Sequence, residues 1–107
     1  MSQEMIDSLL KELKLGLTTL YGNQLNAVYL FGSYARGEQD LESDFDVLIV
    51  LSYMKLYSAE IERTGELVST LSLKYGVSIS RKFMTIGQWT RTDSAIHRNI
   101  LAEAVKV

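Results

Sequence analysis

The stretch LFGSYARGE, residues 30–38, leads from an apolar segment into a polar one, and SDFDV, residues 43–47, follows it at the head of a strongly apolar run. This order predicts a strand, a Gly-Ser turn, a short polar segment and a second strand that opens with two alternate aspartates. Such an arrangement can hold a polyphosphate against metal ions, because a turn backbone and a pair of carboxylates face the same ligand. These two stretches therefore predict both the fold and the site.

The two aspartates, Asp44 and Asp46, are separated by one residue. Successive side chains of a strand point to opposite faces, so the two carboxylates project to the same side and Phe45 projects into the opposite layer. The carboxylates would repel each other at neutral pH, and Mg²⁺ relieves this repulsion because it binds one or two carboxylates together with substrate phosphates. The alternative is two solvated carboxylates at a strand start. The Gly-Ser turn at the expected distance before them favours a site for Mg²⁺ and a nucleotide.

The turn itself predicts a phosphate site. Gly32 lets the backbone approach a ligand closely, and backbone N–H groups at a turn into a helix start attract an anion. Ser33 would add a hydroxyl donor, although serine at such a position also serves simply as a helix cap. Arg36 is the nearest cation, and its planar fork can bind a phosphate bidentately. Gly37 is expected to serve the backbone rather than the ligand.

Two other ligand-binding motifs are excluded by single residues. Gly32 and Gly37 have the spacing of a P-loop, but Glu38 and Gln39 stand where that motif requires Lys and Ser or Thr. The alternate acidic residues from Asp40 onward are similar to the start of an EF-hand loop. That loop requires glycine at its sixth position and glutamate at its twelfth, where this chain has Phe45 and Leu51.

Taken together, Gly32-Ser33, Arg36-Gly37 and residues 43–47 resemble the signature of the DNA polymerase β-type nucleotidyltransferase superfamily. The short length and the ending of the chain are similar to its minimal nucleotidyltransferase (MNT) branch, whose domains are often paired with a HEPN-domain partner in toxin-antitoxin systems. The resemblance covers nearly the whole chain. It implies a polymerase β-like nucleotidyltransferase fold, which is an α/β (α+β) domain with a small mixed β-sheet flanked by helices.

The resemblance also implies an activity. A member of this family uses Mg²⁺ to transfer a nucleoside monophosphate from a nucleoside triphosphate, here expected to be ATP, to a hydroxyl acceptor, which in this branch can be a partner toxin. The catalytic and metal-binding roles fall on Asp44 and Asp46. The nucleotide-binding positions are Gly32, Ser33, Arg36 and Ser43.

One departure from the family pattern leaves a second function open. Members that catalyse usually carry a third carboxylate on the strand after the second helix, where it helps to bind metal. The candidate positions here are Ser78 and Ser80, and serine replaces neither an anionic ligand nor a general base. The alternative to an enzyme is therefore a catalytically weak or inactive antitoxin-like module that binds and neutralises a HEPN-domain partner.

The length of 107 residues fits one domain, residues 1–107, with a single core. A formal net charge of −2 lacks the basic excess of a nucleic-acid-binding domain and argues against template-directed polymerisation. The absence of cysteine excludes disulfides and thiolate metal sites. No apolar run is long enough to span a bilayer, which favours a cytoplasmic protein. A domain this small is expected to complete its acceptor site with a HEPN-domain protein or a second copy of itself.

Hydrophobic periodicity places the remaining elements. Helices are expected at Ser2–Tyr21, Ala59–Lys74 and Ser94–Val105, and strands at Ala27–Phe31, Phe45–Leu51 and Val77–Met84. The first helix should bury one stripe made of Ile6, Leu9, Leu10, Leu13, Leu17 and Leu20.

Several local features are expected from individual residues. Ser2 and Ser58 are predicted N-caps, and Gly76 should end the second helix. Gln88-Trp89 is expected to begin a turn, with the tryptophan as a core or edge anchor, and Arg81-Lys82 to form a solvated strand end.

Overall fold

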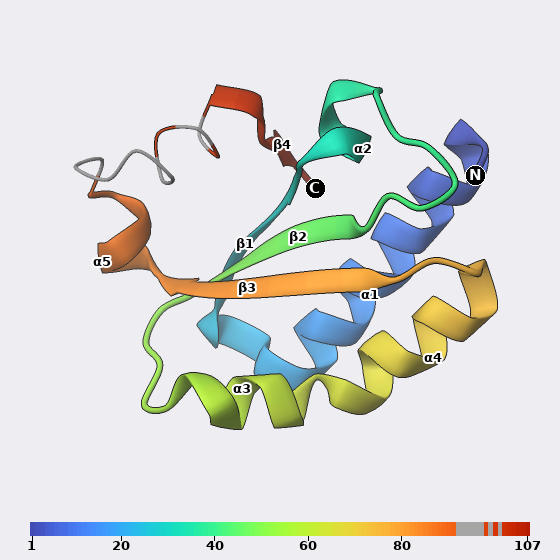
Figure 1. The fold of residues 1–107 in the computed structure, drawn as a ribbon. Helices are drawn as coiled ribbons and strands as arrows, with labels where there is room; N and C mark the ends of the chain where they lie inside the picture. The colour runs from blue at the N-terminus through green and yellow to red at the C-terminus, as the bar shows by residue number, and fades with distance from the viewer. Residues whose placement is uncertain (92–97, 99, 101) are drawn as a thin grey trace.

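The computed structural model describes residues 1–91, 98, 100 and 102–107. Its centre is a four-stranded sheet in the order β3-β2-β1-β4 (Figure 1). The strands are β1 Leu25–Phe31, β2 Phe45–Leu51, β3 Ile79–Thr85 and β4 Val105–Lys106. The helices are α1 Gln3–Tyr21, the 3₁₀ turn η1 Gly22–Gln24, α2 Ser33–Arg36, α3 Tyr57–Arg63, α4 Gly65–Tyr75 and α5 Ile86–Trp89.

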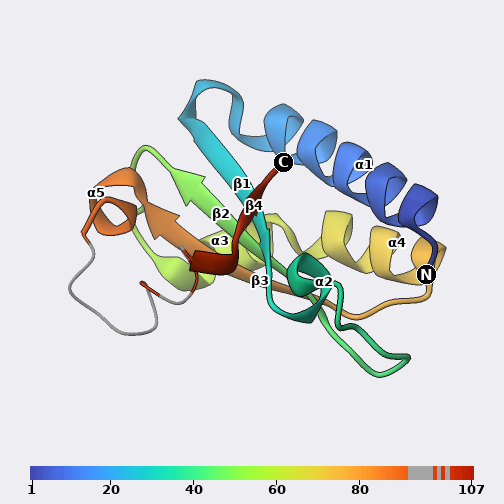
Figure 2. The ribbon, with the colours of Figure 1, turned by 90° about the horizontal axis from the view of Figure 1, so that it is seen from above.

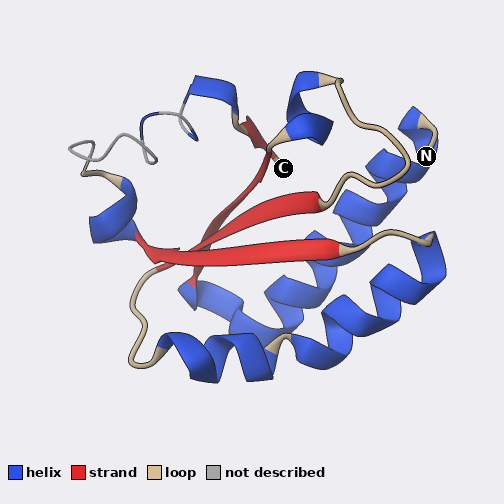
Figure 3. Cartoon of the chain, viewed as in Figure 1, coloured by secondary structure: helices blue, strands red, loops and turns tan. Residues whose placement is uncertain are grey.

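The sheet combines both strand orientations. β1 pairs antiparallel with β2 and with β4, whereas β2 pairs parallel with β3. The parallel pair requires a crossover, which α3 and α4 supply on the same side of the sheet as α1 (Figures 1 and 3). The prediction of a small mixed sheet flanked by helices is confirmed.

The first helix follows its sequence pattern closely. The Ser2 hydroxyl accepts the Met5 N–H at 3.1 Å, and Gly22, at a φ of 55°, ends the helix. Its apolar stripe is buried at Ile6, Leu9, Leu13, Leu17 and Tyr21. Leu20 is 41% exposed, so its assignment to the stripe was wrong. Tyr21 takes the next buried position, four residues after Leu17, as a 3.6-residue period requires.

The predicted helix Ala59–Lys74 is two helices, α3 and α4, that meet at the fully buried Thr64. Arg81 explains the break: its guanidinium donates to Thr64 Oγ1 at 2.7 Å and to the Ile61 carbonyl at 2.8 Å. A carbonyl that bonds a side chain is drawn away from the helical ladder. The prediction that Arg81 is solvated was therefore wrong. The Ser58 cap was also wrong, because Leu56 occupies the N-cap.

Two apolar cores lie on opposite faces of the sheet. On one face Val47 and Ile49 of β2 pack with α1, α4 and the neighbouring strands. On the other face Leu48 and Val50 pack with Trp89 and Ile100. Every residue of β2 from Val47 to Leu51 is buried, as expected for a strand covered on both sides. Figure 1 shows α1, α3 and α4 below the sheet and α2 above it, and Figure 2 looks down on the sheet from the side of α2.

The C-terminal part differs from its prediction where the structure describes it. Gln88 and Trp89 belong to α5, which begins with a capping box formed by Thr85 and Gln88, rather than to a turn. The predicted helix Ser94–Val105 lies largely outside the described residues. Arg98, Ile100, Ala102 and Glu103 are helical. Val105 was predicted wrongly, because it pairs with Leu30 in β4. No helix among the described residues is both long and apolar enough to cross a bilayer.

Candidate functional site

The two aspartates lie at the start of β2. Phe45, the first residue of the strand, is fully buried in the core shared with α1 and α4, so Asp46 faces the opposite side of the sheet. Asp44 directly precedes the strand and is exposed, whereas Asp46 is half-buried. The predicted opposite orientation of Phe45 and Asp46 is confirmed, and the projection of Asp44 to the same side as Asp46 stays a prediction.

The electrostatics of the pair favour a cation. The pKa of Asp46 is raised above its usual value, first by burial and then by the charge of Asp44, while Lys82 and Arg36 oppose the rise. No cluster of three or more His, Cys, Asp or Glu side chains that could hold a metal exists among residues 1–91, 98, 100 and 102–107. The protein thus offers two carboxylates and no complete cage. Mg²⁺ suits this donor set, because it commonly takes its remaining ligands from phosphates and water.

The Gly-Ser turn lies directly against Asp46. Phe31, the last residue of β1, is the antiparallel partner of Asp46, so the chain leaves the sheet at Gly32 beside that carboxylate. Gly32 has a φ of +76°, and a Cβ there would overlap Asp46 Oδ2. Both its backbone conformation and its space therefore require glycine. The two predicted halves of the site meet at this point.

The short helix α2 holds the other two predicted phosphate ligands. Ser33 is its first residue and Arg36 its last, and Gly37 ends it at a φ of +71°, donating its N–H to the Ser33 carbonyl. Gly37 thus serves the backbone, as predicted. The Arg36 guanidinium donates to Glu38 at 3.2 Å and to Glu103 at 2.8 Å.

Glu103 is a site residue that the sequence did not indicate. One carboxylate oxygen accepts the Gly32 N–H at 3.2 Å, and the other accepts from Arg36 at 2.8 Å. The hydrogen bond from Arg36 is the main reason that the pKa of Glu103 is lowered. Its partners lie 71 and 67 residues earlier in the chain, so no local pattern could have revealed the contact.

Ser43, predicted to bind nucleotide, is engaged within its own loop. Its hydroxyl accepts the Asp40 N–H at 2.9 Å and donates to the Asp40 carboxylate at 3.3 Å. This is a local turn that stabilises the loop before β2. The hydrogen bonds of Ser43 are with Asp40, and its role in nucleotide binding stays a prediction.

The parallel register of β2 and β3 locates the serine that replaces the third carboxylate. Ser80 is the β3 partner of Asp46 and lies on the same face of the sheet, whereas Ser78 precedes the strand. A carboxylate at position 80 would face Asp46 directly. Lys82 lies two residues farther on that face, which explains why it lowers the pKa of Asp46.

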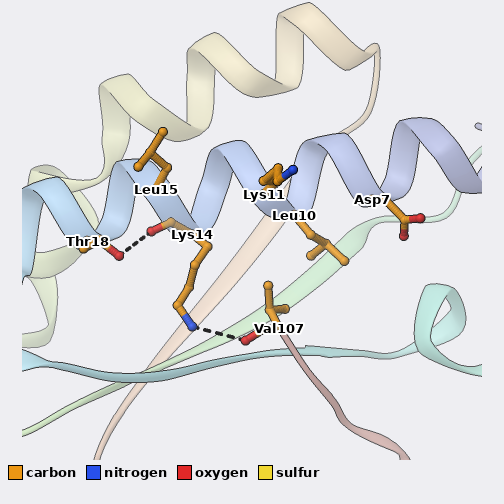
Figure 4. Close-up of a pocket in the computed structure, with 7 residues that line it drawn as sticks. All are labelled: Asp7, Leu10, Lys11, Lys14, Leu15, Thr18 and Val107. Carbon is orange, nitrogen blue, oxygen red and sulfur yellow. Dashed lines mark hydrogen bonds between the residues drawn. The ribbon is translucent and has the colours of Figure 1, made fainter.

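A separate hollow lies away from the aspartates, between α1 and the C-terminal residue (Figure 4). Lys14 crosses it and donates from Nζ to the Val107 carbonyl at 3.1 Å. The hollow is lined by Asp7, Leu10, Lys11, Lys14, Leu15, Thr18 and Val107. None of the predicted site residues contributes to it, so its chemistry does not compete with the site on β2.

The sequence and the fold are similar to those of known proteins. The sequence profile of the nucleotidyltransferase domain family matches residues 10–106. This chain belongs to that family. One relative is a protein of Methanocaldococcus jannaschii that is assigned by name as a protein adenylyltransferase. It is 43% identical over 75 residues, which cover 70% of this nucleotidyltransferase domain and 75% of the relative. A second, assigned in the same way, is 34% identical over 95 residues, or 88% of this chain and 89% of the relative.

Solved structures agree on the fold. A crystal structure of a toxin-antitoxin with AMP-PNP superimposes with a TM-score of 0.61 at 19% identity and covers 88% of this chain and 68% of its own. A mutant of the toxin-antitoxin MntA-HpeT superimposes with a TM-score of 0.60 at 19% identity, over 89% of this chain and 70% of its own. The nucleotidyltransferase domain therefore has the fold of these toxin-antitoxin components.

Proposed function

We propose that this nucleotidyltransferase domain transfers adenosine monophosphate from ATP to a hydroxyl group of a partner protein, in a reaction that depends on Mg²⁺. One observation carries the proposal: the Gly32 turn lies against the Asp46 carboxylate, with Asp44 two residues earlier, directly before the strand. Protein adenylyltransferase is also the assignment of the two archaeal relatives. The toxin-antitoxin structures support the presence of a partner protein, and the family resemblance makes a HEPN-domain protein the expected acceptor.

In this reaction the residues act mainly by positioning and by neutralising charge. Asp44 and Asp46 would hold Mg²⁺, which supplies a positive charge for the triphosphate oxygens. The Gly32 N–H, the Ser33 hydroxyl and the Arg36 guanidinium would bind the same triphosphate from the other side. These contacts orient the α-phosphorus toward the incoming hydroxyl, and orientation of this kind is a large part of phosphoryl-transfer catalysis.

The transfer itself exchanges one phosphorus–oxygen bond for another. The acceptor oxygen bonds to the α-phosphorus, the bond from that phosphorus to the β-bridging oxygen breaks, and pyrophosphate leaves. The acceptor hydroxyl releases its proton to water, since Ser80 offers no carboxylate to take it. We therefore expect slow turnover relative to enzymes that have a general base at this position, because such a base typically contributes about 10²–10⁴-fold.

The test uses the domain purified together with the protein encoded beside its gene. ATP labelled at the α-phosphate should label that partner, and ATP labelled at the γ-phosphate should not. Asp44→Asn and Asp46→Asn should abolish the label, whereas Glu42→Gln, a change of an exposed acidic residue in the preceding loop, should retain it. Labelling of the partner that is unchanged in Asp44→Asn would refute the mechanism.

Ser80 favours one alternative, an antitoxin that neutralises its partner by contact alone. The position opposite Asp46 lacks the carboxylate that would complete a metal site, which motivates this proposal. In that case the domain carrying Asp44→Asn would still inhibit the partner, and neither this variant nor the wild type would transfer the label. Failure of the purified pair to associate would exclude contact inhibition.

A further inference from the structure

We propose that Glu103 is an intramolecular competitor for the triphosphate, so that nucleotide binding must displace its carboxylate from the Gly32 turn. This inference rests on the proposed function, because it assigns a regulatory role to the same site. Glu103, held by the residues that follow it up to Val107, would then set the affinity of the site for nucleotide.

Glu103 accepts hydrogen bonds from groups that are expected to bind the triphosphate. Its two oxygens accept from the Gly32 N–H at 3.2 Å and from Arg36 Nη1 at 2.8 Å. These are two of the three donors that the proposed function assigns to phosphate. An N–H group that already donates to a carboxylate is not available to a phosphate oxygen, so the two anions exclude each other at this turn.

The contacts of Glu103 are those of a competitor for phosphate rather than those of a third metal ligand. Glu103 is oriented by Arg36 and by the turn, and the part of the chain that the structure describes contains no cluster of three or more acidic or histidine side chains that could hold a metal. The hydrogen bonds of Glu103 are with the Gly32 N–H and the Arg36 guanidinium, the kinds of partner that a phosphate would seek. Its charge also helps to raise the pKa of Asp46, as a second anion beside the aspartates would. The carboxylate therefore stands in for the anion of the ligand.

The residues that follow Glu103 hold it in place. The segment that follows it pairs with β1 through β4, and the Val107 N–H donates to the Val28 carbonyl at 2.8 Å. The Lys14 ammonium also donates to the Val107 carbonyl, across the hollow shown in Figure 4. An anion held on the same chain competes at a high effective concentration, and its side chain is 26% exposed, so it can leave toward solvent.

The experiment compares the affinity of Mg-ATP for the wild type and for two variants of Glu103 by calorimetry. Glu103→Gln removes the charge and Glu103→Ala removes both hydrogen bonds, so each should bind Mg-ATP about fivefold more tightly than the wild type. Glu38→Gln is the matched control, because Glu38 also contacts Arg36 but makes no contact with Gly32. We expect that control to change the affinity much less. Adenosine, which has no phosphates, should bind all four proteins equally.

A second measurement reports the contact in the free protein. In Glu103→Ala the Gly32 amide should exchange with solvent faster than in the wild type, as detected by NMR, while the Gly37 amide should be unchanged because it donates to Ser33. This readout also shows whether the variant is folded.

The outcomes separate two kinds of failure. If the wild type binds Mg-ATP and both Glu103 variants bind it equally or more weakly, the competitor is refuted while the nucleotide site stands, and weaker binding would make Glu103 a ligand instead. If no folded variant binds Mg-ATP, the proposed nucleotide site is itself refuted, and the competitor is refuted with it. Binding that appears only in the Glu103 variants would support both.

Discussion

The two faces of β2 are built for different purposes. Toward the helices, Phe45, Val47, Ile49 and Leu51 form an unbroken buried row. On the opposite face Leu48 and Val50 are equally buried, but Asp46 at the end of the row is only half-buried and carries a raised pKa. The rest of the strand is buried, and Asp46 stands at its end, where burial disfavours the ionised carboxylate. This is the carboxylate to which we assign a metal ion in the proposed function.

The largest effect should come from the helix-covered face. Leu13 is fully buried there, so Leu13→Ala should lower the free energy of unfolding by about 3 kcal/mol. Leu15 on the same helix is 68% exposed, and Leu15→Ala should change the free energy of unfolding by no more than about 0.5 kcal/mol. Urea denaturation measures both. Equal losses for the two variants would contradict the assignment of the core.

The next effect tests the turn on the opposite face. Gly32→Ala should cost about 2 kcal/mol or more, because its φ of 76° and ψ of −157° lie in a region that is open almost only to glycine, and because the added Cβ would overlap the Asp46 carboxylate. Gly37→Ala is the control for an ordinary left-handed glycine: its φ is 71° and its ψ is 23°, and nothing lies within 4 Å of the added Cβ, so only a backbone cost of about 1 kcal/mol should appear. Urea denaturation should separate the two. Equal costs would show that Asp46 does not contact the turn.

A smaller effect should follow from restoring the third carboxylate. Ser80→Asp places a negative charge opposite Asp46, and like charges on paired strands should cost about 0.5–1 kcal/mol in the absence of metal. Mg²⁺ should return the unfolding temperature to the wild-type value or above it. Ser78→Asp, which precedes the strand, should show a weaker response to Mg²⁺. A metal response that is the same at both positions would argue against a cation at Asp46.

The smallest effect should be a gain in stability. Asp46→Asn removes the negative charge that burial and Asp44 disfavour. Without metal and at neutral pH, the free energy of unfolding of this variant should therefore be about 0.5 kcal/mol higher than that of the wild type. The same substitution should abolish Mg-dependent nucleotide binding. A loss of stability in Asp46→Asn would show that the carboxylate is structural rather than poised for a ligand.

The predictable parts of the structure were those that local chemistry determines. The bounds of β2, Phe45–Leu51, follow from its apolar run, and Ser2 and Gly22 mark the ends of α1 through their cap chemistry. The meeting of Gly32 with Asp46 could also be predicted, because consecutive strands are usually neighbours in the sheet, and an antiparallel pair places the end of the first strand beside the start of the second.

The unpredicted parts depend on contacts between distant residues. Gly65 marks the junction of α3 and α4 locally, but the contact of Thr64 with Arg81, 17 residues later, is not contained in any helix propensity. The bond from Arg36 to Glu103 spans 67 residues, and Ser43 turns back to Asp40 where the motif alone suggested a ligand contact. Side chains of this kind find their partners only when the fold has formed, which is why the site was only partly predictable.

The most direct test of the central claim is calorimetric titration of ATP into the wild type and into Asp44→Asn, each with and without Mg²⁺, with Glu42→Gln as control. Asp44 and Asp46 should hold the nucleotide through the metal, so we expect binding by the wild type and by the control only when Mg²⁺ is present, and none by Asp44→Asn. ATP binding of equal affinity in Asp44→Asn, or binding by the wild type that does not depend on Mg²⁺, would contradict the account.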